Sequence, residues 1–139
     1  MNWQDLLINK PVSVSEIING LSDIFNVSVS DILVVHEIPS KPLPPNIKVL
    51  GELSTITGDF EIMLSIYLRT EELLKKSSEV STLVEQFCEK LNCYCLIDDN
   101  SVNPCSWLMI KGHQRFERVY LDPEKMDNER YIIVRTETN

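Results

Sequence analysis

The sequence predicts a single α+β domain over residues 1–139, with two helices packed on a mainly antiparallel sheet. Three observations support this class. The chain is long enough, and at 43% apolar residues hydrophobic enough, to bury a core without disulfides or metal. Two segments repeat apolar residues at helical spacing. The remaining apolar segments are short, β-rich runs that follow one another, so the predicted order is α-βββ-α-ββββ rather than alternating βαβ units.

The first helix is predicted over roughly residues 14 to 26. Ser13 and Glu16 have the spacing of a capping box, which marks a helix start. The apolar positions that follow form one stripe: Val14, Ile17, Ile18, Leu21, Ile24 and Phe25. We expect this helix to lie across a sheet and to end near Asn26.

The next segments predict three strands. Residues 32–38 are rich in β-branched side chains, and a proline-rich stretch that cannot pair regularly follows them. Residues 47–69 predict a long hairpin, whose two-residue turn is Gly58-Asp59. The resulting register pairs Thr57 with Phe60, Leu53 with Leu64, and Val49 with Leu68. It also places Gly51 opposite Ile66, which indicates a bulge or a closely approaching helix.

The second half predicts one more main helix and four strands. Apolar spacing indicates a helix over roughly 79–91, preceded by a shorter helical turn at 71–76, and Asn92 is typical of a left-handed helix end. The four strands are expected at about 93–97, 106–112, 115–121 and 130–136. Polar loops at 98–104 and 122–129 join some of them.

The charge of the chain constrains its partners. Asp and Glu number 21 against 13 Lys and Arg, which gives a net charge of −8. Such a surface repels phosphate backbones and anionic lipids and attracts basic proteins, so we expect no nucleic acid or membrane binding. The first residues lack the features of a secretory signal, and no apolar run is long enough to cross a bilayer. Cytoplasm is therefore the expected compartment, and the four cysteines are expected to be free thiols.

Candidate chemistry is sparse. Cys93 and Cys95, with Cys105 and His113 further along, are the nearest approach to a metal motif. On a strand the first two would be about 7 Å apart, which suits joint tetrahedral ligation poorly. Carboxylate pairs such as Asp98-Asp99 are also ordinary turn residues. We therefore predict neither metal nor cofactor, and no enzymatic activity.

One face of the 47–69 hairpin is a candidate protein-binding surface. It combines the apolar residues Leu50, Ile56, Met63 and Tyr67 with Glu52 and Glu61. If it is exposed, an amphipathic patch rimmed by acid has the anatomy of a protein interface. The alternative is that a helix or a second sheet covers this face, and the sequence leaves both open.

The chain resembles the small acidic immunity proteins of bacterial polymorphic and contact-dependent toxin systems. The resemblance lies in its general character and in three segments: Cys93-Tyr94-Cys95-Leu96-Ile97-Asp98-Asp99, Asn103-Pro104-Cys105-Ser106-Trp107 and Arg118-Val119-Tyr120-Leu121-Asp122. It implies an inhibitor of a cognate, basic nuclease toxin. The carboxylates expected to contact such a partner are Asp98, Asp99, Asp122, Glu124 and Asp127, together with Glu52, Glu61 and Tyr67 on the hairpin.

Two other classes remain open. Type III secretion chaperones are similar in being small, acidic and dimeric, with a helix followed by three strands at the start. This chain differs from them by ending in strands. A small enzyme is the third possibility, with Cys105 beside His113, or the carboxylate pairs, as its reactive groups. The sequence leaves the oligomeric state undetermined.

Overall fold

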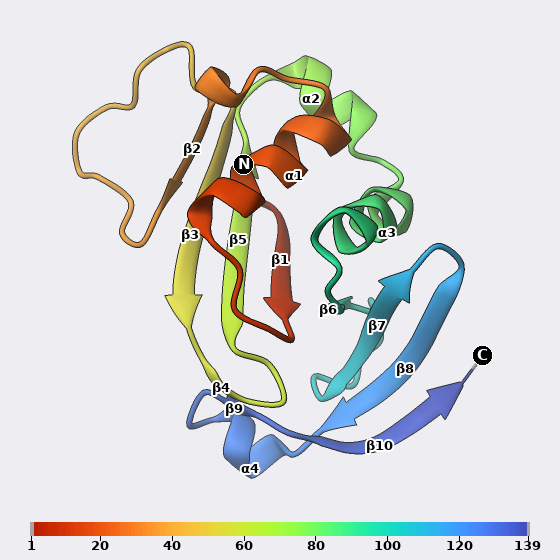
Figure 1. The fold of residues 1–139 in the computed structure, drawn as a ribbon. Coiled ribbons are helices and arrows are strands. Elements are labelled where there is room, and N and C mark those ends of the chain that lie inside the picture. The colour runs from red at the N-terminus through yellow and green to blue at the C-terminus, as the bar shows by residue number, and fades with distance from the viewer. Residues whose placement is uncertain (1, 139) are drawn as a thin grey trace.

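The computed structural model describes residues 2–138 and has an α+β fold. Two main helices, α1 (Val14–Phe25) and α3 (Val80–Leu91), pack with a mainly antiparallel, mixed sheet of eight strands (Figure 1). The sheet order is β10-β8-β7-β6-β1-β5-β3-β2, in which only β2 and β3 pair in parallel. The strands of this sheet are β1 (Asn2–Ile8), β2 (Ile32–Val35), β3 (Val49–Thr55), β5 (Ile62–Leu68), β6 (Cys95–Asp98), β7 (Ser106–Gly112), β8 (Arg115–Leu121) and β10 (Ile133–Thr138).

The helices begin and end as the sequence predicts. Ser13 and Glu16 form the complete capping box of α1, and Asn26 ends it in the left-handed conformation with φ 54°. Asn92 ends α3 in the same way, with φ 52°. The short helix α2 (Glu71–Lys76) precedes α3, and a 3₁₀ turn (Val29–Asp31) precedes β2. The buried faces of α1, α2 and α3 form the main core with one face of the sheet.

Strand β1 was not predicted, although it lies near the middle of the sheet between β5 and β6. Both faces of its second half are covered, so Leu6, Leu7 and Ile8 are all buried and show no alternation. Its first half is polar, and a register shift near Trp3 interrupts the pairing. A run of three apolar residues beside an irregular polar segment is too short a pattern to identify a strand.

The hairpin prediction is confirmed in its strands and wrong at its turn. Val49 pairs with Leu68 and Leu53 with Leu64, as expected. Gly51 lies opposite Ile66 without a bulge, and the side chains of Leu64 and Val34, rather than a helix, occupy the space beside it. The connection is wider than a two-residue turn, because Thr57–Gly58 forms a separate strand, β4, that pairs in parallel with β9 (Arg130–Tyr131).

This connection builds a smaller core on the other face of the sheet. Phe60, which the predicted two-residue turn would pair with Thr57, instead packs with Leu7, Leu96 and Tyr131, on the face opposite Leu64 and Ile66. The predicted loop 122–129 contains a short helix, α4 (Pro123–Met126), whose Met126 packs against the same core. The predicted strand 130–136 is divided into β9 and β10. Strand 32–38 ends early, at Val35.

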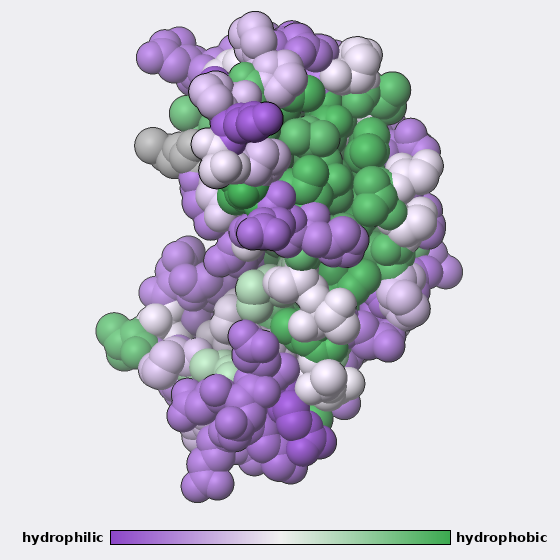
Figure 2. Space-filling view, turned by 90° about the vertical axis from the view of Figure 1, so that its left-hand side faces the viewer, coloured by the Kyte–Doolittle hydropathy of each residue, from purple (hydrophilic) through white to green (hydrophobic). Residues whose placement is uncertain are grey.

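The surface separates by polarity. Viewed from the β2 side, hydrophobic residues gather in the upper part of the molecule, and hydrophilic residues cover the lower end where α4 lies (Figure 2). Within residues 2–138, no helix is both long and apolar enough to cross a membrane.

Candidate functional site

A groove opens where β1 and β6 separate. The two strands pair at Leu7–Leu96 and Ile8–Cys95, whereas the pairing of β1 with β5 continues to Asn2. From Leu7 toward the start of β1, the sheet is therefore split between β1 and β6. The groove has a volume of about 970 Å³ and is lined by the first half of β1, the start of α3, the loop after β6, and parts of β7 and β8.

The groove is acidic. Asp5 on β1 and Asp98 on β6 are both exposed and line it from opposite sides of the split. Glu79 occupies the N-cap position of α3, but its side chain makes no capping hydrogen bond and is exposed. None of these three carboxylates forms a salt bridge with a cation among residues 2–138. Their negative charges are therefore left to face solvent or a partner.

A fourth carboxylate, Asp99, faces inward and holds the loop after β6. Its side chain is 3% exposed, accepts a short hydrogen bond from the Ser106 hydroxyl, and lies 3.4 Å from Nε of Arg118. Burial by itself would raise the pKa of Asp99, but the hydrogen bonds from Ser106 and Ser101 and the charge of Arg118 outweigh burial, so the pKa is lowered. Among residues 2–138, Arg118 is the one cation that lines the groove, and Asp99 pairs with it.

Two more of the predicted partner-binding residues lie on the sheet face next to Asp5. Glu52 pairs across β5 with Ser65, which in turn pairs with Asp5. Tyr67 pairs with Asn2 on the same side of β5. Burial, followed by the negative charges of Glu52 and Asp5, raises the pKa of Tyr67. Asp98 and Asp99 thus line the groove, whereas Glu52 and Tyr67 lie on the adjoining strands β3 and β5 and do not line it.

The other four predicted residues lie away from the groove. Asp122 caps α4 by accepting hydrogen bonds from the backbone N–H groups of Glu124 and Lys125, and Asp127 ends that helix. Glu61 lies in the connection before β5, where its backbone N–H donates to the Ile8 carbonyl. None of the four lines the groove. Asp5 and Glu79 were missed because only the three-dimensional fold brings them together, and β1 itself gave no clear strand pattern.

The hairpin face that the sequence left open is largely covered. Leu50 and Ile56 are each 5% exposed, and Ile56 packs in the smaller core. Met63 and Tyr67 are half-buried. The apolar part of this face is therefore core, and its polar part continues the acidic region around Asp5.

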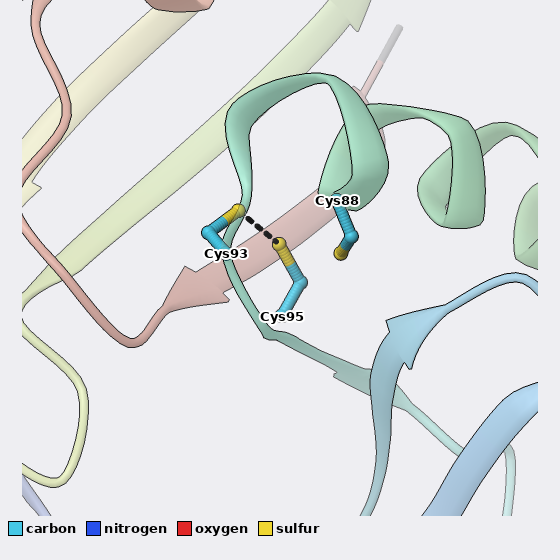
Figure 3. Close-up of side chains that lie close together, drawn as sticks. All are labelled: Cys88, Cys93 and Cys95. Atoms are coloured by element: carbon cyan, nitrogen blue, oxygen red, sulfur yellow. Dashed lines mark hydrogen bonds between the residues drawn. The ribbon is translucent and has the colours of Figure 1, made fainter.

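Three cysteine side chains converge in the main core, where α3 meets the sheet (Figure 3). Cys88 comes from the last turn of α3, Cys95 from the start of β6, and Cys93 from the short link between them. Their Sγ atoms all lie within 4.8 Å of one another, and those of Cys93 and Cys95 are 4.0 Å apart. Cys88, Cys93 and Cys95 are 1%, 4% and 0% exposed, respectively. The spacing of Cys93 and Cys95 marks them as neighbours in the sequence, whereas nothing local connects Cys88 with them.

The three thiols perturb one another. The pKa of Cys93 is lowered because Cys88 and Cys95 donate hydrogen bonds to its sulfur. The pKa values of Cys88 and Cys95 are raised, first by the hydrogen bonds within the cluster and then by burial. Of the three thiols, Cys93 is therefore the one whose pKa is shifted toward easier loss of the proton.

The reactive couple of Cys105 and His113, which the small-enzyme alternative requires, is not assembled. Cys105 directly precedes β7 and His113 directly follows it, so a strand of seven residues, roughly 25 Å in length, separates them. His113 is 70% exposed and lies 3.5 Å from a Glu85 carboxylate oxygen. A second pocket, near the end of α1 and lined in part by Asp23 and Lys90, contains neither His113 nor His36.

Comparison of the chain with protein-family models, with curated protein sequences and with solved structures finds no match. What the protein does must therefore be inferred from its own geometry, in which an acidic groove and a buried thiol cluster are the two distinctive sites.

Proposed function

We propose that this protein is a non-enzymatic inhibitor that binds a basic protein partner, as an immunity protein binds its cognate nuclease toxin. The observation that supports this proposal is the groove, where the exposed carboxylates of Asp5, Glu79 and Asp98 have no cation partner among the described residues. The net charge of −8 also makes the protein as a whole attract basic partners.

The chemistry of the groove suits lysine and arginine side chains. Its carboxylates accept charge-assisted hydrogen bonds, and the aromatic rings of Trp3 and Trp107 among its lining residues pack against the aliphatic part of such side chains. Exposed carboxylates at an interface mainly accelerate association and select the partner, so we expect fast, salt-sensitive binding. Glu52 and Tyr67 extend the docking surface across β3 and β5.

The Asp99 carboxylate has a different role in this proposal. Because it is buried against Ser106 and Arg118, it positions the loop that presents Asp98 rather than touching the partner. Asp122, Glu124 and Asp127 form a separate acidic region at α4, and Glu61 lies in the connection before β5. A large partner would reach these residues only by extending beyond the groove.

The two other functional classes have less support. Strand β1 precedes α1, so the chain lacks the helix-first opening that suggested a secretion chaperone. An enzyme using Cys105 and His113 requires contact between two residues that lie at opposite ends of β7.

The test begins with affinity capture from the native host and continues with neutralisation. The tagged wild type is compared with an Asp5→Lys/Asp98→Lys variant and with a Glu124→Lys/Asp127→Lys control, and the two variants carry the same net charge as each other. We expect the wild type and the control to retain a basic protein that the groove variant loses. Expressing that protein alone should arrest growth, and co-expression with the wild type, but not the groove variant, should restore it.

Two results would overturn the proposal. One is capture of a partner that is not basic, or that is retained equally by the groove variant. The other is a captured protein that is harmless alone, because an immunity function requires a toxic target.

A further inference from the structure

We infer that Cys88, Cys93 and Cys95 form a binding site for one divalent thiophilic metal ion, with Zn²⁺ as the expected ion. The observation is the convergence of three buried sulfur atoms, within 4.8 Å of one another, at the junction of α3 and β6. This site is independent of the groove and of the proposed inhibitor function.

The spacing of the sulfurs fits zinc. Thiolates that bind zinc tetrahedrally at about 2.3 Å lie ~3.8 Å from one another. The Sγ atoms of Cys93 and Cys95 are already 4.0 Å apart, and the third sulfur is within 4.8 Å of both. Small rotations of the Cys side chains close the remaining difference. The expectation of a 7 Å spacing was wrong because Cys93 precedes β6, so the two residues do not lie on one regular strand.

The backbone holds the three residues in place. Asn92, in the left-handed conformation, reverses the chain directly after α3, and the Cys93 N–H donates to the Cys88 carbonyl at 3.0 Å. A helix end followed by a strand start therefore fixes the ligand-bearing segment from both sides. In the metal-free protein the Cys88 thiol donates a hydrogen bond to the Ile110 carbonyl oxygen on β7 at 3.5 Å. This bond is lost with the thiol proton when a metal binds.

The charge balance favours a divalent over a monovalent ion. Metal ligation requires thiolates, so the thiol protons pass to solvent when the metal binds. Three thiolates with Zn²⁺ leave a net charge of −1, whereas three thiolates with Cu⁺ leave −2. Burying net charge in an apolar core is costly, so the divalent complex is the less costly of the two. Three protein ligands leave the fourth tetrahedral position to a non-protein ligand.

The first test uses the wild-type protein alone. The reduced chain is refolded from urea with Zn²⁺ or Co²⁺, dialysed against a weak chelator, and analysed for bound metal. We expect one metal per chain, thiolate-to-cobalt charge-transfer absorption, and an X-ray absorption spectrum with three sulfur ligands. We also expect the midpoint of thermal unfolding to rise with zinc.

The second test uses single-cysteine variants. Cys95→Ser and Cys88→Ala should abolish the stoichiometric metal and the charge-transfer absorption, whereas Cys105→Ser, which changes the one half-buried cysteine outside the cluster, should leave both unchanged. Wild-type protein that refolds fully but retains no zinc would overturn the inference, as would loss of the signal in Cys105→Ser. Stoichiometric binding of Cu⁺ but not of Zn²⁺ or Co²⁺ would overturn the assignment to a divalent ion.

Discussion

Asp5 and Asp98 occupy matching positions on β1 and β6, two residues beyond the last backbone pair that joins these strands, Leu7 with Leu96. The sheet separates at the point where two carboxylates would otherwise lie side by side. Like charges directly opposite each other destabilise a strand pair, so the two aspartates favour the split that forms the groove. The same two residues thus shape the groove and give it its charge.

Neutralising one aspartate of this pair should make stability less dependent on salt. In the wild type, added salt screens the repulsion between Asp5 and Asp98, so the free energy of unfolding should rise between low and physiological ionic strength. Asp5→Asn should show a smaller rise and be within about 0.5 kcal/mol of the wild type at high salt. Urea unfolding at several ionic strengths measures this, with Glu124→Gln as a matched control. Equal salt dependence in all three proteins would contradict the prediction.

Removing the charge of Asp99 should destabilise the protein in a pH-dependent way. Asp99→Asn loses an anionic acceptor of hydrogen bonds and leaves Arg118 without its partner, which we expect to cost about 2 kcal/mol at pH 7. Because folding lowers the pKa of Asp99 below its ordinary value of 3.8, this contribution is present above that pH and is lost as the pH falls through the lower, folded value.

Urea unfolding of the wild type and Asp99→Asn at a series of pH values tests this. The difference between them should close below about pH 4. Asp98→Asn is the control, because Asp98 is exposed and should have a small effect at every pH. A difference that persists unchanged in acid would show that the side chain's charge is not responsible.

A methyl group at Gly58 should disrupt the contact between β4 and β9. Gly58 has φ +105°, and a Cβ atom built there would lie 2.5 Å from the Tyr131 carbonyl oxygen. Gly58→Ala therefore combines backbone strain with a backbone clash and should cost roughly 2 kcal/mol or more. Thr57→Ala, at the exposed neighbouring position, should cost much less. Urea unfolding measures the loss of stability in each variant. Comparable losses would refute the close approach of Gly58 to the Tyr131 backbone.

The four cysteines should differ sharply in reactivity in the metal-free protein. Cys105 is half-buried, whereas the other three are nearly inaccessible. An excess of maleimide should therefore label one thiol per native chain promptly, and the rest only as fast as the protein opens. Mass spectrometry of peptides identifies the labelled residue. Rapid labelling of Cys93 in the native state would contradict the buried cluster.

Local patterns predicted most of the fold. The capping box at Ser13, the left-handed asparagines at 26 and 92, and the strands 106–112 and 115–121 are all found where the sequence places them. These features depend on residues close in sequence. The wide connection after β3 was not predicted, because its conformation depends on β9, far along the chain.

The candidate sites were predicted only in part for the same reason. Asp98 and Asp99 were recognised as an acidic pair, but the groove exists only because β1 and β6 meet in space. Cys93 and Cys95 were recognised as neighbours, but an ideal strand geometry was assumed for both. Cys88 belongs to an apolar helix stripe, and no local signal separates a metal ligand from a small core residue there.

The parallel pairing of β4 with β9 has a consequence for the order of events during synthesis. Thr57 pairs with Arg130 and Gly58 with Tyr131, so this contact forms only after more than 70 further residues have been made following Gly58. Until then Phe60, which packs with Tyr131 in the mature fold, lacks part of its cover. Long-range contacts of this kind slow folding. While the β3–β5 hairpin is formed but β9 is not yet paired with it, its exposed aromatic surface favours aggregation. The synthesis of Arg130 and Tyr131 therefore sets the earliest time at which the smaller core can be completed.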